Sequence, residues 1–395
     1  MIVLVANLGS TSFKYKLFDM PSEQVLAVGA CDRIGLGDSA WDVTAGDHQQ
    51  QGNADLPDHA AAVELHLGKL VELGVIGTID AVEAIGFKAV HGGPISGAVR
   101  VTDDVLQTMQ RFVPLAPAHN PPYITAMKSF REKLPGVEQV AAFETAFHQT
   151  IPLARQVYAI PCEWIEQHGI RRYGFHGASH RYLSERLAKL VGPTHNSISL
   201  HLGGSCSICA IDSGDSVANS FGTSAQTGVF HNNRVGDFDP FAIPALEAAG
   251  LDRDEIYRRL GKESGLLGLS GVSSDLREVE QAADRGDTRA KLAVEAFVES
   301  CRHYLGAYLA VLNGADAIAF TGGIGQHAST IREAICDNLD FAGIVLDPLK
   351  NESADGRVES RIDHADATTR IYIIPTNEEL IVARQTVEVL AKQAA

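Results

Sequence analysis

Five short segments of the 395-residue chain combine histidine, basic or acidic side chains with small residues. They are residues 88–93, 116–121, 143–148, 174–180 and 233–240. Chemically versatile side chains in loops are better candidates for function than side chains in a core. Because lysine, arginine and histidine recur among them, the segments suit an anionic substrate, whose charge these cations can neutralise.

Single histidines in these segments also have a structural interpretation. Buried or capping histidines are more common than catalytic ones, and we keep this alternative open for His91, His148, His180 and His201. We expect His180 to cap the helix that follows it.

Two hairpins with small turns form a repeat. The chain opens with an apolar run, a turn rich in glycine and hydroxyl groups at 7–12, and an alternating stretch that ends at Asp19. The pattern recurs from Ser197 to Asp212 around a turn at 203–207. Backbone N–H groups and hydroxyls in such turns can bind a polyphosphate from two sides. The repeat predicts two facing lobes with a nucleotide between them, and two ordinary hairpins remain the alternative.

A strand, a glycine turn and a helix follow one another near residue 320. The periodicity predicts a long helix over 287–313, a buried strand over 315–320, and then a second helix through Ile335. The connecting turn is Thr321-Gly322-Gly323-Ile324-Gly325. Nucleotides dock at such turns, although α/β proteins also use them for packing alone.

The remaining pattern alternates strands with helices, which predicts α/β layers. We expect helices over 60–73, 104–112, 122–134, 180–191 and 378–392, and strands over 84–90, 139–143 and 371–374. Thr376 or Asn377 can cap the last helix. We therefore expect the C-terminal helix to return to the core that the N-terminal strand begins.

Composition excludes several classes of protein. Hydrophobic residues make up 45% and charged residues 21%, which excludes a disordered, collagen-like or coiled-coil chain. The net charge of −16 argues against nucleic acid or an anionic membrane as a partner. We find no signal peptide or spanning segment and predict a cytoplasmic protein. The six scattered cysteines indicate reduced thiols, and the isolated pair Cys206 and Cys209 indicates core packing rather than a zinc site.

Taken together, these segments resemble the acetate kinase family from end to end. The motifs that carry the resemblance are Asn7-x-Gly9-Ser10-x-Ser12-x-Lys14, Val90-His91-Gly92-Gly93, Leu115-Ala116-Pro117-x-His119-Asn120-Pro121, Thr145-Ala146-Phe147-His148-Gln149, Arg171-Arg172-Tyr173-Gly174-Phe175-His176-Gly177-x-Ser179-His180, the stretch from Ser264 to Asp275, Phe320-Thr321-Gly322-Gly323-Ile324-Gly325 and Pro375-Thr376-Asn377-Glu378-Glu379-Leu380.

The resemblance implies an α/β fold of the actin-like, sugar-kinase-like type, with two duplicated ribonuclease-H-like lobes and a nucleotide cleft. The N-terminal lobe would comprise residues 1–146 plus 376–395 and would bind the carboxylate and the phosphate. The C-terminal lobe, 147–375, would bind the nucleotide and form a homodimer. The implied reaction is reversible, direct in-line transfer from ATP to a short carboxylate, which yields ADP and an acyl phosphate with Mg²⁺ or Mn²⁺ present.

The resemblance also assigns roles to individual residues. The implied catalytic residues are His176, Arg234, Glu144 and Lys88, and the implied substrate contacts are Lys88, Val90, His119 and Phe175. Asn7 and Glu378 would hold the metal. The implied nucleotide and phosphate contacts are Lys14, Ser10, Ser12, His201, Gly203, Gly204, Asp275, Leu276, Arg277, Gly323, Ile324, Gly325 and His327. Arg234 would clamp two anions that must approach to about 3 Å, and His176 would steady the transferring phosphoryl group.

The chain departs from the family pattern at active-site positions. Lys88 replaces an arginine and Glu144 replaces an aspartate, so we hypothesise a compensated pair in which the longer Glu144 reaches Lys88. Ala118 replaces a leucine, which opens room for an acid larger than acetate. Gly204 replaces an asparagine, and Gln326-His327 replaces Glu-Asn, which leaves a phosphoryl donor other than ATP, including pyrophosphate, as an alternative.

Two further alternatives follow from these departures. The first is the same chemistry on a larger or different carboxylate. The second is a nucleotide-binding regulatory protein with weak transfer activity, and Lys88, Glu144 and Gly204 are the residues that favour it.

Overall fold

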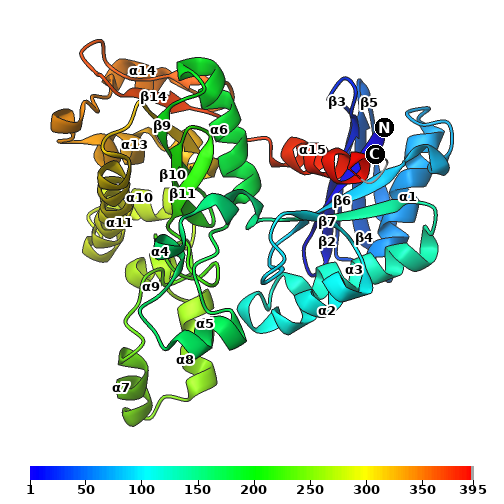
Figure 1. The fold of residues 1–395 in the computed structure, drawn as a ribbon, viewed down its shortest axis with the longest axis horizontal. Helices are drawn as coiled ribbons and strands as arrows, with labels where there is room; N and C mark the ends of the chain where they lie inside the picture. The colour runs from blue at the N-terminus through cyan, green and yellow to red at the C-terminus, as the bar shows by residue number, and fades with distance from the viewer. Residues whose placement is uncertain (393–395) are drawn as a thin grey trace. The chain divides into compact units, whose positions relative to one another are not determined.

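A computed structural model of the chain describes residues 1–392, which divide into two compact units. Unit 1 comprises Met1–Ala146 together with the described part of the C-terminal segment that begins at Asn377. Unit 2 is Phe147–Thr376. In Figure 1, unit 1 contains the blue and cyan elements and the red C-terminal helix, so the first strand and the last helix belong to one unit.

Unit 1 is built on one large mixed sheet. Its strand order is β5-β4-β3-β2-β1-β6-β8-β7. The strands are β1 (Ile2–Leu8), β2 (Ser12–Asp19), β3 (Gln24–Asp32), β4 (Ser39–Ala45), β5 (His48–Ala54), β6 (Ala84–Ala89), β7 (Ala98–Arg100) and β8 (Glu138–Phe143). The predicted first hairpin is confirmed, because β1 pairs antiparallel with β2 from Ile2 opposite Asp19 to Leu8 opposite Phe13.

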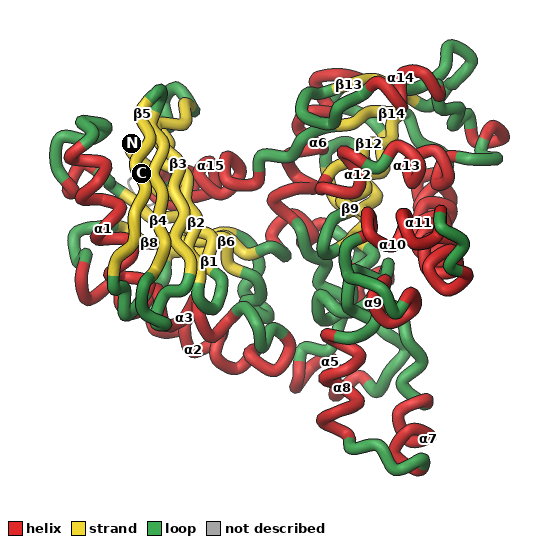
Figure 2. The backbone as a smooth tube through the Cα atoms, turned by 180° about the vertical axis from the view of Figure 1, so that it is seen from behind, coloured by secondary structure: helices red, strands yellow, loops and turns green. Residues whose placement is uncertain are grey.

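Helices cover both faces of this sheet. They are α1 (His59–Glu72), α2 (Asp103–Arg111), α3 (Asn120–Lys133) and α15 (Glu378–Ala391). Figures 1 and 2 show α15 on the face opposite α1 and α3. Gly86 of β6 permits close packing of α15, since an added Cβ would lie 2.4 Å from Thr386 Oγ1. The Asn377 side chain caps α15 by accepting from Leu380 N at 3.3 Å, as predicted.

Unit 2 repeats the topology of unit 1. Its sheet has the order β11-β10-β9-β12-β14-β13. The strands are β9 (Asn196–Leu202), β10 (Cys206–Asp212), β11 (Asp215–Asn219), β12 (Ala317–Thr321), β13 (Ser360–Arg361) and β14 (Arg370–Ile373). In unit 1, β1 pairs antiparallel with β2 and parallel with β6. In unit 2, β9 pairs antiparallel with β10 and parallel with β12. The order β3-β2-β1-β6-β8 thus matches β11-β10-β9-β12-β14, which confirms the predicted duplication.

Two helices enclose the sheet of unit 2. Leu183 and Leu187 of α6 (Gly177–Val191) pack on Ala317 and Ala319, and α11 (Thr288–Leu312) packs on the opposite side of the strands. The other helices of unit 2 are α4 (Leu153–Gln156), α5 (Cys162–His168), α7 (Ala242–Ala248), α8 (Arg253–Lys262), α9 (Gly265–Ser270), α10 (Leu276–Asp284), α12 (Gly322–His327), α13 (Ser329–Cys336) and α14 (Pro348–Ser353).

Two local predictions were wrong. The helix expected through Ile335 is broken at Ala328, where the backbone leaves the helical region with φ −93° and ψ 88°, so α12 and α13 are separate. His180 does not cap a helix, because α6 begins three residues earlier, at Gly177. The residue at the N-cap position is His176, which has a left-handed backbone with φ 55°.

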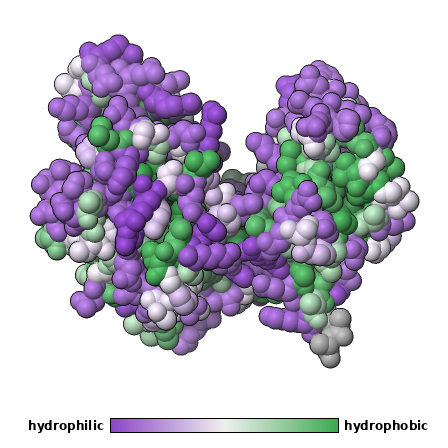
Figure 3. All heavy atoms as spheres, turned by 90° about the horizontal axis from the view of Figure 1, so that it is seen from above, coloured by the Kyte–Doolittle hydropathy of each residue, from purple (hydrophilic) through white to green (hydrophobic). Residues whose placement is uncertain are grey.

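The polarity of the surface and the free, mostly buried cysteines agree with the expectations from composition. Hydrophilic residues cover most of the face drawn in Figure 3. Among the helices of residues 1–392, none is long and apolar enough to cross a membrane. All six cysteines are free thiols, and all but Cys162 are buried. Cys206 and Cys209 are both inaccessible to solvent, as expected for core packing.

Candidate active site

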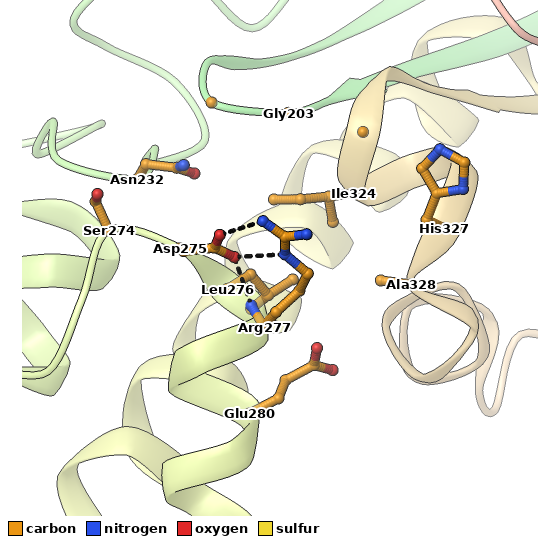
Figure 4. A pocket seen from close by; sticks show the side chains of 12 residues that line it. Gly203, Asn232, Ser274, Asp275, Leu276, Arg277, Glu280, Ile324, His327 and Ala328 are labelled. Atoms are coloured by element: carbon orange, nitrogen blue, oxygen red, sulfur yellow. Dashed lines mark hydrogen bonds and ion pairs between the residues drawn. The ribbon is translucent and has the colours of Figure 1, made fainter.

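A pocket of about 600 Å³ lies in unit 2, where three connections meet (Figure 4). They are the β9–β10 turn, the start of α10 and the β12–α12 turn. Eight of the predicted nucleotide contacts line it: Gly203, Gly204, Asp275, Leu276, Arg277, Gly323, Ile324 and His327. The predicted glycine turns of the second hairpin and of the strand–turn–helix therefore open onto one cavity.

Glycine at position 322 allows the two turns to meet. Its φ of +76° lies in the left-handed region, and an added Cβ would stand 2.5 Å from Leu202 O at the end of β9. The Cβ position of Gly203 lies 3.6 Å from Gly323 N, an ordinary van der Waals distance, so the two turns are in contact. A side chain at position 322 would push the β12–α12 turn away from β9 and distort the pocket wall.

The Asp275–Arg277 pair forms the opposite wall. Asp275 caps α10 by accepting from Arg277 N at 2.9 Å, and its carboxylate also accepts from Arg277 Nε at 3.0 Å. Hydrogen bonding by the Arg277 guanidinium lowers the pKa of Asp275. Figure 4 shows the guanidinium held by these bonds and pointing into the pocket, as Ile324 does from the other wall. A planar cation and an apolar side chain in this arrangement can hold an aromatic base.

His176 lies against the β9–β10 hairpin. Its Nδ1 is 2.8 Å from Ser207 Oγ on β10. Its ring stacks on that of His201 of β9, with 4.1 Å between the ring centroids, and meets the edge of Phe221 at 5.2 Å. Because both strands contact it, the orientation of His176 follows that of the hairpin.

Arg234 is attached to the same hairpin. Its Nη1 donates to Ser205 Oγ in the β9–β10 turn at 3.3 Å and to Ala225 O at 3.0 Å. Burial lowers the pKa of the Arg234 guanidinium. Arginine nevertheless remains protonated in proteins, so a charged group is held beside the turn that lines the pocket.

Unit 1 holds a cluster of Lys88, Glu144 and Glu378. Lys88 lies near the carboxyl end of β6, Glu144 directly follows β8, and Glu378 is the first residue of α15. Lys88 Nζ is 3.8 Å from Glu144 Oε1, and it forms a closer ion pair with Glu378 Oε2. The side chains of Lys88, Glu144 and Glu378 are 19%, 6% and 12% exposed.

The two carboxylates keep Lys88 charged. Burial alone lowers the pKa of the ammonium, but the charges of Glu378 and Glu144 outweigh burial and raise the pKa above its ordinary value. The hypothesis of a Lys88–Glu144 pair agrees with the 3.8 Å contact. It omitted Glu378, however, which is the nearer carboxylate.

Asn7 and the first Gly/Ser turn lie at one end of the β1–β2 hairpin. Tyr123 Oη donates to Asn7 Oδ1 at 3.3 Å and accepts from Leu8 N at 3.1 Å, and burial raises the pKa of Tyr123 to about 12. Lys14 of β2 is exposed and stands opposite Asn7 in the pairing. Ser10 is exposed in the turn, and Ser12 O accepts from Gly9 N at 2.9 Å.

The predicted metal residues fit a magnesium ion that is carried largely by phosphates. Among residues 1–392 there is no group of three His, Cys, Asp or Glu side chains that could hold a metal ion. Mg²⁺ typically takes one or two carboxylates, several waters and substrate phosphate oxygens instead. The carboxylate of Glu378 and the amide oxygen of Asn7 are suitable ligands of that kind.

The remaining five predicted residues also lie outside the pocket lining. Val90 is half-buried just after β6, and His119 occupies the N-cap position of α3. Phe175 is buried with its ring against the edge of Phe221. Gly325 is buried against Phe320, behind the pocket wall, and His201 stacks on His176.

Sequence reasoning did not select Asn232, Ser274, Glu280 and Ala328, which also line the pocket. Two signals could have found some of them. Ser274 directly precedes Asp275 in a motif already singled out, and Glu280 lies three residues after Arg277, on the same face of α10. Asn232 lies in a segment whose hydrophobic residues follow no regular period, so no such signal points to it.

A duplicated sheet that begins with a hairpin, a pocket formed by glycine turns, and an arginine and a histidine held beside one of these turns define a two-domain phosphotransferase. Residues 2–384 match the Acetokinase family, and the chain belongs to that family. The predicted resemblance is thereby confirmed.

Curated relatives and solved structures agree with this assignment. The acetate kinase of Shouchella clausii is 44% identical over 390 residues, which span 98% of each protein. The crystal structure of Porphyromonas gingivalis acetate kinase superimposes with a TM-score of 0.90 at 38% identity, covering 98% of this chain and 99% of that one. A propionate kinase from Francisella tularensis gives a TM-score of 0.90 at 36% identity, with 98% and 99% covered.

Proposed function

We propose that this protein transfers the terminal phosphoryl group of ATP to acetate or a closely related short carboxylate, in a reversible reaction. A carboxylate oxygen forms a bond to the terminal phosphorus while the bond from that phosphorus to the bridging oxygen breaks, and ADP leaves. The products are an acyl phosphate and ADP, and no proton is transferred. Membership of the family supports the reaction class.

One observation carries the proposal: a single hairpin connects the pocket with His176 and Arg234. Gly203 and Gly204 of its turn line the pocket, Ser205 contacts Arg234, and Ser207 contacts His176. Phosphates that lie against the turn would thus have the guanidinium and the imidazole beside them. Hydrogen-bond donors fixed at this position stabilise the charge of a loose phosphoryl-transfer transition state.

The nucleotide binds in the pocket of unit 2, with its base between Ile324 and the Arg277 guanidinium. In unit 1, Lys88 supplies the cation for the carboxylate substrate, and Val90 and His119 contact the same substrate. Lys14, Ser10 and Ser12 bind the phosphates of the nucleotide. Lysine cannot form the planar two-pronged clamp of an arginine, so Glu144 and Glu378 are needed to fix the Lys88 ammonium.

Asn7 and Glu378 would hold Mg²⁺, or Mn²⁺, together with the phosphates of ATP. The ion supplies positive charge that neutralises the phosphate oxygens. Tyr123 orients the Asn7 amide by its 3.3 Å hydrogen bond.

A hydroxamate-trapping assay with ATP, Mg²⁺ and a panel of acids from formate to branched carboxylates tests this function. We expect acyl phosphate with acetate and propionate and none without ATP. Calorimetric titration with ADP and with pyrophosphate is the companion measurement. Absence of ADP binding, or turnover with pyrophosphate alone, would contradict the nucleotide assignment.

A larger carboxylate is the second candidate substrate. The structural similarity to the Francisella tularensis propionate kinase and the small Ala118 side chain favour it. A kcat/KM for a longer acid that exceeds the value for acetate would establish it. Tight ADP binding with no acyl phosphate from any acid would instead indicate a regulatory protein.

We also propose a homodimer in the cytoplasm. Unit 2 exposes large apolar side chains on its helical segment 238–269: Phe241 is 84% exposed and Tyr257 is 56% exposed. A second copy of the chain would cover them, and use of ATP supports the cytoplasm as the compartment. Light scattering should give twice the mass of 42.3 kDa, and F241D should reduce it.

A further inference from the structure

Four side chains of unit 2 form a continuous row of hydrogen-bonding atoms that ends at His176. Ser199 Oγ is 2.6 Å from His180 Nδ1, and His180 Nε2 is 2.7 Å from Ser207 Oγ. Ser207 Oγ is in turn 2.8 Å from His176 Nδ1. Ser199, His180 and Ser207 are all inaccessible to solvent, so water cannot replace these contacts.

The secondary structure explains why the row forms. Ser199 lies on β9 and Ser207 on β10, which pair antiparallel. His180 is in the first turn of α6, and His176 stands four residues before it, at the N-cap position. Residues at this spacing share a helix face. Both imidazoles therefore face the two strands, and the hydroxyl of Ser207 lies between them.

Each side chain in the row has a limited number of protons that it can donate in hydrogen bonds. Burial lowers the pKa of His180 well below its ordinary value, so this imidazole is neutral and carries a single ring proton. Each serine hydroxyl has one proton as well. When His176 is also neutral, the protons can be ordered in only two ways. Either Ser207 donates to His180 and accepts from His176, or it accepts from His180 and donates to His176.

The buried hydroxyl of Ser199 distinguishes the two orders. If His180 Nδ1 donates to Ser199, the proton of Ser199 needs another acceptor, and within residues 1–392 its only hydrogen-bond partner is His180. A buried donor left without an acceptor costs about 1–3 kcal/mol. If Ser199 donates to His180 Nδ1 instead, every proton in the row has an acceptor.

We propose that Ser199, His180 and Ser207 form a directed hydrogen-bond relay that holds His176 in the tautomer with its proton on Nε2. The order is Ser199 to His180, His180 Nε2–H to Ser207, and Ser207 to His176 Nδ1. Nε2–H of His176 is then a donor for the transferring phosphoryl group. Ser207 is the central positioning residue. The inference rests on the proposed function, in which His176 acts on that group.

The proposal predicts a defect in turnover rather than in substrate binding. S207A removes the donor to His176 Nδ1, and the ring can then adopt either tautomer. We expect kcat to fall by about ten- to a hundredfold, as is typical when the hydrogen-bond partner that orients a metal-ligating imidazole is removed. The KM values for ATP and carboxylate and the ADP affinity should change less than threefold. S207T keeps the hydroxyl and should recover most of the kcat.

Tautomers can be measured directly by long-range ¹⁵N–¹H correlation spectra of the full chain labelled at histidine, at a pH where His176 is neutral. The signal missing from H176Q identifies His176. We expect the wild-type protein to show the proton on Nε2 and a hydrogen-bonded Nδ1, and S207A to show a mixture. S199A should shift the His180 signals and lower kcat to a smaller extent.

S216A is the matched control, because Ser216 is a buried serine that contacts another buried imidazole, His148 Nδ1, at 2.8 Å. It should leave the His176 tautomer unchanged. A wild-type His176 with its proton on Nδ1, or an S207A variant with unchanged tautomer and kcat, would overturn the relay. Wild-type kcat in H176Q would instead overturn the role of His176 in the proposed function, so the two failures are distinguishable.

Discussion

Exchanging Lys88 for arginine and Glu144 for aspartate, separately and together, tests whether the two departures from the family pattern compensate each other. At 3.8 Å and an effective dielectric constant of about 20, a unit charge pair has a gross attraction of about 4 kcal/mol. Glu378 competes for the same ammonium, and desolvation opposes the pairing. We therefore expect a coupling energy of about 1–2 kcal/mol, within the range measured for contacting residues.

Each single exchange should lower kcat/KM for acetate. In K88R a planar guanidinium meets a carboxylate that is one methylene too long, and in E144D the shortened carboxylate no longer reaches the ammonium. The double variant should exceed the value expected from the two singles by about 5- to 30-fold, which is the coupling energy expressed as a rate ratio.

The assay is initial-rate production of ADP at saturating ATP with varied acetate, for the wild type and the three variants. Thermal unfolding of each variant separates a folding defect from a catalytic one. Additive changes in log kcat/KM would refute the pairing. Repeating the cycle with Glu378→Gln in place of Glu144→Asp shows which carboxylate is coupled to Lys88, since Glu378 forms the nearer ion pair.

Three further predictions follow from the site and from the core of unit 1. R277A should weaken ADP binding about tenfold by calorimetry, because the guanidinium held by Asp275 lines the pocket, and unchanged affinity would contradict this. E378Q should raise the Mg²⁺ concentration for half-maximal activity several-fold, and an unchanged Mg²⁺ dependence would exclude Glu378 as a ligand. Burial lowers the pKa of His66 to about 4, so the unfolded chain binds the extra proton first as the pH falls from about 6.5 to 4. His66 therefore removes stability over that window, and H66F should show a smaller decrease in urea unfolding free energy between pH 7 and pH 4.5 than the wild type shows.

The hairpins and the glycine turns were predictable from sequence because their signals are local. Apolar alternation and small turn residues in 2–19 and 197–212 need no knowledge of the rest of the chain. Strand β5 shows the opposite case. Its sequence, HQQQGNA, has no apolar face, and it is a strand only because β4 offers it a complete set of backbone partners from Ser39 to Ala45. Such tertiary pairing overrides a polar pattern.

The residues of the candidate site also divide into those that local sequence motifs predict and those whose contacts depend on the tertiary fold. Asp275 and Gly323 were selected because they stand in motifs that match the family, and in the structure both residues line the pocket. The ion pair of Lys88 with Glu378 could not be predicted from local patterns, because it depends on how α15 docks on β6. That docking is set by the close approach of Thr386 to Gly86. The break between α12 and α13 depends on tertiary context as well, since the buried Arg332 donates to Gly325 O and Gln326 O.

The register of β9 against β10 links the pocket of unit 2 to His176 and Arg234. Cys206 pairs with Leu202 and Ser207 with His201, so the turn at 203–205, the contact to His176 and the contact to Arg234 share one ladder. A slip by one residue would turn Ser207 to the other face of the sheet and remove it from His176. Cys206 N donates to His231 Nδ1 at 2.7 Å and so also anchors the segment that carries Arg234. The positions of Arg234 and His176 relative to the β9–β10 turn are therefore determined by strand pairing. Strand pairing can thus give side chains on loops the fixed geometry that phosphoryl transfer would require of them.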